Sequence, residues 1–141
     1  MLAVEDALDA LKWAESIGGL PSLVARSEAN LKTLHDWVDA TPWVDFLCAD
    51  AATRSCTSIC FTITDDWYAG LSDEAKTKAL KDFTALLDKE EVAYDIGAYR
   101  DAPAGLRIWG GATVERADIS ALLPWLDWAW GEVKATAKAA A

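Results

Sequence analysis

The alternation of helical and strand-like patterns is the feature that most limits what this chain can fold into. Two amphipathic segments, about 3–17 and 23–40, carry apolar residues at helical spacing, and a Gly-Gly pair and a Thr-Pro pair end them. A further helical pattern begins at Ser72, a residue type that caps helices, and acidic residues follow it in the first turn. A last helical pattern follows Asp118.

Four short segments between these helices are rich in β-branched and aromatic residues, as strands are. They are residues 43–48, 57–63, 92–96 and 106–111. The predicted order is therefore α-α-β-β-α-β-β-α. This order predicts an α/β fold of the α+β kind: a small, mainly antiparallel four-stranded sheet with helices packed on one face.

Composition excludes several classes of function. The chain has 23 acidic and 13 basic residues and a formal net charge of −10, and its arginines are scattered, so nucleic acid and anionic membranes are not expected partners. No apolar run reaches the roughly 18 residues of a membrane span, and the acidic N-terminus is unlike a secretory signal. Three cysteines without a spaced framework favour a reducing, cytoplasmic location.

The chain offers little for catalysis by itself. A single histidine and three cysteines lack the spacing of a metal site, and neither a nucleophile elbow nor a glycine-rich phosphate loop is present. All eight lysines fall on polar faces of helical patterns, whereas a lysine that forms a Schiff base needs a desolvated pocket. We therefore predict no catalytic, cofactor-binding or metal-binding residue.

Two arginines, Arg100 and Arg107, flank a short loop in this acidic chain. A guanidinium fork suits carboxylate and phosphate, which makes both arginines candidate ligands for an anion. Arg107 lies in a predicted strand between two apolar residues, so it should point to the face opposite theirs. The alternative is that Arg100 pairs with Asp101 or Asp95 and that Arg107 is a solvated position on the sheet.

Three long stretches of the sequence resemble one enzyme family, in the same order along the chain. They are MLAVEDALDALKWAESIGG, DFLCADAATRSCTSICF and VAYDIGAYRDAPAGLRIWGGATVERADISALLPWLDWA. All three resemble phosphoserine aminotransferases, which are fold-type I enzymes that use pyridoxal phosphate. The third stretch resembles the C-terminal part of that family and contains both arginines.

The resemblance implies a reaction and a role for each arginine. The family transfers an amino group between glutamate and 3-phosphohydroxypyruvate in serine biosynthesis, and its intact members are dimers. The arginine that matches Arg107 binds the substrate α-carboxylate. The arginine that matches Arg100 contributes to the site for the phosphate or distal carboxylate. Together they would serve a substrate with two anionic ends.

Members of that family are more than twice as long as this chain. Met1 resembles an internal methionine, residues 1–19 resemble the interdomain helix, and 20–141 resemble the C-terminal small domain. The large domain, with pyridoxal phosphate and its lysine, would then be a missing partner, so this chain alone should be inactive, bind no cofactor and tend to form a homo-oligomer. Two alternatives stay open: a stand-alone module that binds a small dianion, and an interaction fragment that docks through its tryptophans.

Overall fold

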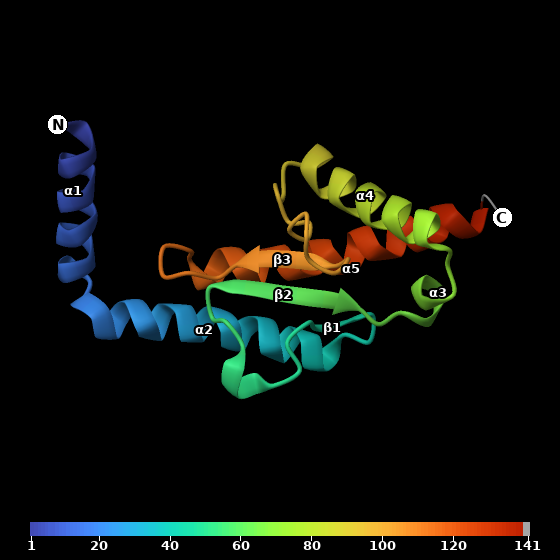
Figure 1. Cartoon of the computed structure of the whole chain (residues 1–141), viewed down its shortest axis with the longest axis horizontal. Helices are drawn as coiled ribbons and strands as arrows, with labels where there is room; N and C mark the ends of the chain where they lie inside the picture. Colours follow the sequence, from blue (N-terminus) through green and yellow to red (C-terminus); the bar gives the residue numbers. More distant parts are fainter. Residues whose placement is uncertain (140–141) are drawn as a thin grey trace.

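A computed structural model describes residues 1–139 of the chain; residues 140 and 141, the end of the predicted 20–141 domain, lie outside the described part (Figure 1). The elements in chain order are α1 (Leu2–Ser16), α2 (Gly19–Ala40), β1 (Val44–Phe46), the 3-10 turn η1 (Ala51–Thr53), β2 (Ser58–Ile63), α3 (Asp66–Ala69), α4 (Asp73–Lys89), β3 (Leu106–Trp109) and α5 (Arg116–Ala139). Ser72 caps α4, as its sequence predicts, by accepting a hydrogen bond from the backbone of Ala75.

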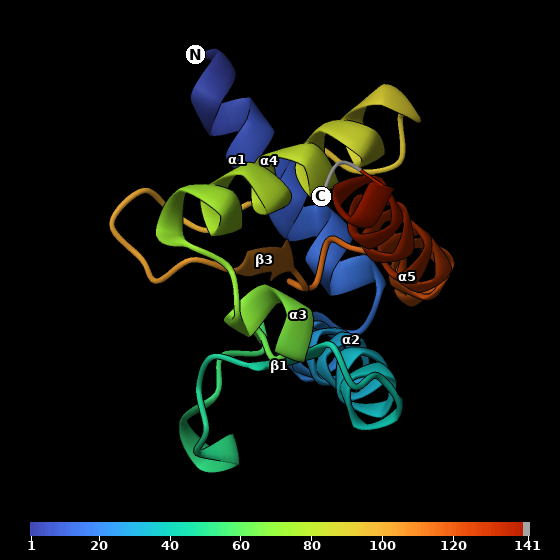
Figure 2. The ribbon, with the colours of Figure 1, turned by 90° about the vertical axis from the view of Figure 1, so that its right-hand side faces the viewer.

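The sheet is antiparallel in the order β1-β2-β3. Its register places Phe61 of β2 opposite both Phe46 of β1 and Leu106 of β3. Alternate residues of each strand are buried, so one face of the sheet belongs to the core. Figure 2, which looks along the strands, shows α2 and α5 together on one side of the sheet. The predicted mixed α/β class with a small antiparallel sheet is confirmed.

The prediction of a fourth strand at residues 92–96 is wrong: the sheet has three strands. Glu91 and Asp95 both have a positive φ, 56° and 51°, and this left-handed conformation takes the chain out of the extended region. Pairing with β3 is therefore reduced to a single bridge between Gly97 and Leu106 and a hydrogen bond from the backbone of Arg107 to the Ile96 carbonyl. The segment runs beside β3 as an irregular connection.

The core joins the sheet to α2, α4 and α5 through aromatic side chains. Trp43 and Trp130 stack with ring centroids 5.0 Å apart, and Phe83 of α4 contacts both rings at about 6 Å. Phe61 stacks on Phe46 across β1 and β2. Such rings each bury a large apolar area, so this cluster fixes how the two long helices lie against the sheet.

Two carboxylates satisfy the indole N–H groups of these buried tryptophans. Asp127 of α5 accepts hydrogen bonds from Trp37 and Trp43. Asp65 accepts from Trp130 Nε1 at 3.1 Å and from Lys134 Nζ at 2.5 Å. Burial by itself raises the pKa of Asp65, but these two hydrogen bonds, one from the backbone of Trp67 and the charge of Lys134 outweigh it and leave the pKa below its usual value.

The lowered pKa of Asp65 predicts a pH dependence of stability. A carboxyl with a depressed folded-state pKa stabilises the fold above its unfolded pKa of about 4 and loses that contribution as the pH falls through the folded value. Asp65→Asn should therefore lower the free energy of unfolding by about 1–3 kcal/mol at pH 7. The difference from the parent chain should shrink below pH 4 in urea denaturation series. Asp66→Asn, at the exposed neighbouring position, is the matched control.

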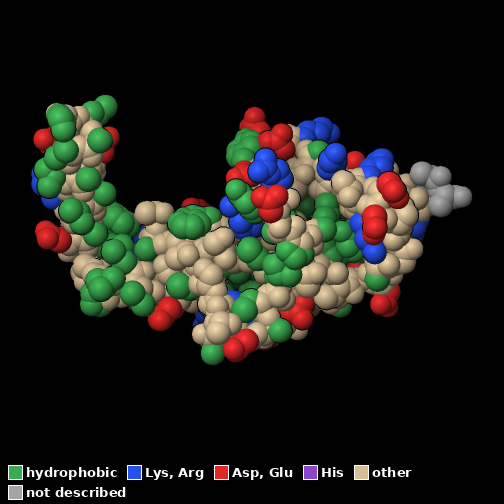
Figure 3. All heavy atoms as spheres, viewed as in Figure 1, with side chains coloured by type: hydrophobic (Ala, Val, Ile, Leu, Met, Phe, Trp, Pro, Cys, Tyr) green, Lys and Arg blue, Asp and Glu red, His purple; other side chains and the backbone are tan. Residues whose placement is uncertain are grey.

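Helix α1 projects from the rest of the chain as an arm. It turns sharply from α2 at Gly18 and Gly19, both of which have a positive φ, and none of its residues is buried (Figure 1). Figure 3 shows apolar side chains along this arm. The exposed apolar residues of α1 and the start of α2 are Met1, Leu2, Val4, Leu8, Leu11, Trp13, Leu20 and Val24. We call this set the arm face.

Candidate functional site

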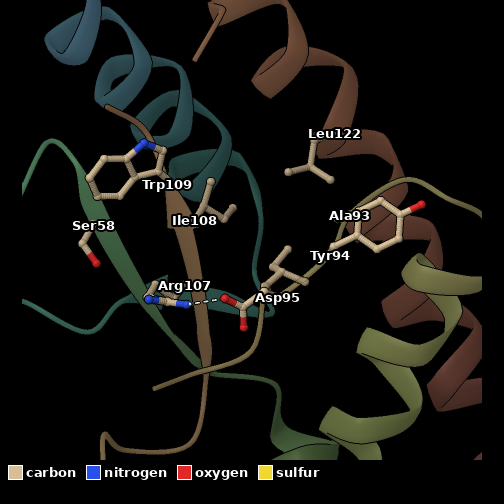
Figure 4. Close-up of a pocket in the computed structure, with 9 residues that line it drawn as sticks. Ser58, Ala93, Tyr94, Asp95, Arg107, Ile108, Trp109 and Leu122 are labelled. Atoms are coloured by element: carbon tan, nitrogen blue, oxygen red, sulfur yellow. Dashed lines mark hydrogen bonds and ion pairs between the residues drawn. The ribbon is translucent and has the colours of Figure 1, made fainter. Parts of the chain in front are cut away.

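Arg107 lies on β3 and points away from the core, as its position between Leu106 and Ile108 predicts. Its side chain is 32% exposed and lines a hollow of about 360 Å³ beside the sheet. Figure 4 shows Ser58 and Trp109 flanking this hollow on the strand side and Leu122 of α5 on the other. The hollow therefore combines one cation with aromatic and apolar walls, the usual make-up of a small-ligand site.

Asp95 is the partner of Arg107 among the described residues. Nη2 of Arg107 donates a hydrogen bond to Oδ2 of Asp95 at 3.0 Å (Figure 4). The aspartate side chain is 90% exposed, so the pair lies at the mouth of the hollow and not in the protein interior. The sequence suggests Asp95 only as a partner of Arg100, whereas in the structure Asp95 pairs with Arg107.

Arg100 lies away from this site. Its side chain is 87% exposed, and its Nε is 3.7 Å from Oδ1 of the adjacent Asp101. It does not line the hollow that contains Arg107. The structure of residues 1–139 thus brings Arg107 into a candidate site but does not bring Arg100 to it, and the two arginines do not form one anion site in this part of the chain.

Asn30 of α2 is a positioning residue that sequence reasoning missed. It is 1% exposed, and its side-chain NH₂ donates to the carbonyl oxygens of Gly110 and Val114 at 3.1 and 3.0 Å, with Gly111 at 3.4 Å. These carbonyls form the turn that follows β3. Asn30 therefore fixes the end of the strand that carries Arg107. A polar residue at a helix position that faces the core was the available signal.

The residues present do not fit the attachment site of pyridoxal phosphate. Most lysines are exposed; Lys134 is partly buried but is paired with Asp65, and Lys76 lies over the ring of Tyr68. None of the eight lysines lines the hollow beside Arg107. Within residues 1–139, no three His, Cys, Asp or Glu side chains gather in a way that could hold a metal ion.

The helices in the described part of the chain include none that is both long and apolar enough to cross a membrane. Four tryptophans have exposed side chains in the described part of the chain: Trp13, Trp109, Trp125 and Trp128.

The fold is similar to that of a segment of solved aminotransferase structures. A solved structure of phosphoserine aminotransferase from Bacillus circulans subsp. alkalophilus superposes on 86% of this chain with a TM-score of 0.65 and 20% identity, and 30% of that chain is covered. A second solved structure, of phosphoserine aminotransferase with radiation damage of the Schiff base, superposes over the same shares of the two chains with a TM-score of 0.64 and 18% identity. At this identity, the likeness concerns the fold.

The sequence comparison is more specific. Over 134 residues the chain is 49% identical to phosphoserine aminotransferase of Methanosarcina barkeri and 47% identical to that of Methanosarcina mazei. Both alignments span 95% of this chain and 34% of the relative, so the chain corresponds to about a third of the proteins that it matches. No family model matches the chain. The resemblance to phosphoserine aminotransferase is thereby confirmed, and the coverage is consistent with a C-terminal segment.

Proposed function

We propose that this chain serves as the small domain of a phosphoserine aminotransferase and contributes Arg107 to the binding of a substrate carboxylate. The observation that carries the proposal is the half-buried guanidinium of Arg107 in a hollow of suitable size, within a segment nearly half identical to that enzyme. A bidentate contact to a carboxylate would use the donors that Asp95 leaves free.

Pyridoxal phosphate and its lysine belong, in this proposal, to a large domain outside the segment that this chain spans. The surroundings of the eight lysines support this division. Six are exposed, and the two that are partly buried, Lys134 and Lys76, have an anionic and an aromatic partner. This chain's own part is to hold one end of a dianionic substrate. Amino transfer between glutamate and 3-phosphohydroxypyruvate in serine biosynthesis would require both domains, in a cytoplasmic dimer.

The arm face supports the docking of this large domain. Residues 1–19 would act as the interdomain helix, with 20–141 as the small domain. Helix α1 has no buried residue and carries several exposed large apolar side chains, and exposed apolar patches often mark interaction sites. We propose that the arm face packs against the part of the relatives that this chain does not span, whether in the same or a separate polypeptide. The exposed tryptophans that favoured an interaction fragment are consistent with the same docking.

A stand-alone module for a small dianion receives less support. That reading needs two cationic groups at one site, and Arg100 is exposed on its own loop, paired with Asp101. In the proposed assembly, Arg100 would approach the distal end of the substrate only when the large domain is docked. In the chain alone, we expect Arg107 to dominate binding.

Arg107→Gln is expected to weaken binding of phosphoserine and glutamate by the chain about 10- to 150-fold, because a charge-assisted contact contributes about 1.5–3 kcal/mol. Titrations of the ¹⁵N-labelled chain, followed at the backbone amide signals of Ser58 and Trp109 beside the hollow, would measure the affinity in the parent and in each variant. Arg107→Lys should recover only part of it, since an ammonium lacks the planar fork.

The control for this experiment is Arg116→Gln, which removes an equal charge at the exposed start of α5. Arg100→Gln should resemble this control in the isolated chain. Shifts that persist unchanged in Arg107→Gln would show that the ligand binds elsewhere, and the proposed role of Arg107 would have to be abandoned.

A further inference from the structure

The contact between Arg107 and Asp95 uses only a small part of the hydrogen-bonding capacity of the arginine. One nitrogen of the guanidinium meets one oxygen of the carboxylate, and the described residues supply no other hydrogen-bond or ion-pair partner for this side chain. A guanidinium has five N–H donors, so most of its capacity remains available. Asp95 approaches from the solvent side, where 90% of its side chain is exposed.

The backbone holds Asp95 close to Arg107. Its φ of 51° lies in the left-handed region, which Asp and Asn adopt more readily than most residues. Next to it, the Ile96 carbonyl accepts a hydrogen bond from the backbone N–H of Arg107 at 2.8 Å. The main chain at Asp95 is thereby fixed to β3, while its side chain is free to rotate into water.

We propose that Asp95 is a resident counter-anion of Arg107, which a substrate carboxylate displaces on binding. This inference rests on the proposed function of Arg107. An exposed aspartate–arginine pair has a small stabilising effect, whereas a bidentate carboxylate in a hollow makes the stronger contact. The exchange is therefore favourable, and Asp95 lowers the affinity of the site by competing for the same guanidinium.

This arrangement also gives Asp95 a role before substrate arrives. With Asp95 in place, the hollow carries a compensated charge, so it does not retain inorganic anions as strongly as a bare arginine would. A ligand must offer a carboxylate and fill the space beside Ser58 and Trp109 to displace the aspartate. Asp95 thus raises the selectivity of the site for organic acids.

The test compares Asp95→Asn with the parent chain, using glutamate and 2-oxoglutarate as probes. Asparagine keeps the size and the left-handed backbone preference of the aspartate but cannot neutralise Arg107. We expect both ligands to bind about two- to fivefold more tightly in the variant, with chloride competing more strongly against each. Asp66→Asn, at an exposed position on α3 away from this pair, is the control for net charge.

Four results would overturn the inference. An equal gain in Asp66→Asn would mean that net charge alone acts on the ligand. A loss of affinity for glutamate without a loss for 2-oxoglutarate would mean that Asp95 binds the ammonium group of an amino acid. Arg107-dependent binding without any gain would remove the counter-anion role and leave the proposed function intact. If neither the parent chain nor the Asp95→Asn variant binds either acid through Arg107, the proposed function is wrong as well.

Discussion

Asn30→Asp should lower the free energy of unfolding at pH 7 by about 3–5 kcal/mol, because it places a buried carboxylate against carbonyl oxygens. The amide of Asn30 donates to the carbonyls of Gly110 and Val114, and aspartate cannot donate when it is ionised. A domain of this size is stable by about 5–15 kcal/mol, so the variant should lose a large share of its stability. Urea denaturation followed by circular dichroism would measure the loss.

The pH dependence of the Asn30→Asp variant separates the effect of the buried charge from that of the changed side-chain shape. We expect the pKa of the new carboxyl to be raised in the folded state, because burial and the facing carbonyls disfavour the anion. The destabilisation should therefore shrink as the pH falls toward the unfolded pKa of about 4, where a protonated carboxyl can donate one hydrogen bond. Asn30→Leu, which has a similar size and no charge, should be less destabilised at pH 7 and show no such recovery. An Asp variant as stable as the parent at pH 7 would contradict the anchoring role of Asn30.

Loss of the hydrogen bonds that Asn30 donates should also disturb the candidate site. Asn30 holds the turn that ends β3, and Arg107 lies on that strand only three residues before Gly110. We infer that the strand end depends on a helix from the opposite part of the sequence.

Much of this fold follows from local sequence patterns. The cap at Ser72 and the alternation in β2 and β3 act over a few residues, so they are visible in the sequence. The segment 92–96 misled the prediction because its apolar pattern resembles a strand, while the left-handed conformation of Asp95 depends on its neighbours in space. Helix α5 begins at Arg116, three residues before the predicted start at residue 119, so Asp118 lies in its first turn.

The candidate site was harder to predict than the fold. The outward direction of Arg107 follows from strand alternation, but its pairing with Asp95 requires the positions of two segments 12 residues apart. The exposure of Arg100 could not be read from its spacing to Arg107, because the loop between them directs the two side chains independently. For Asn30 the local signal was only a polar residue at a core-facing helix position; its contact with a turn 80 residues away depends on the tertiary fold.

Gly105→Ala should destabilise the chain by about 3 kcal/mol, at the upper end of the range for overpacking. A Cβ at this position would lie 2.0 Å from the carbonyl oxygen of Phe61 and 3.1 Å from its carbonyl carbon. Both atoms belong to the backbone of β2, so no side-chain rotation can relieve the clash. The strand pair β2–β3 or the loop before it must shift instead.

A matched glycine substitution tests this interpretation. Gly131 lies within α5, where an added Cβ has no neighbour within 4 Å, so Gly131→Ala should stabilise the chain by about 0.5–1 kcal/mol through helix propensity. Thermal and urea denaturation of both variants should therefore give changes of opposite sign. Because Gly105 comes two residues before Arg107, its replacement should also weaken ligand binding beyond what Gly131→Ala does. Equal stabilities for the two variants would mean that β2 and β3 can move apart at Gly105 without a loss of free energy. The strand that carries Arg107 would then be held less firmly than its register implies.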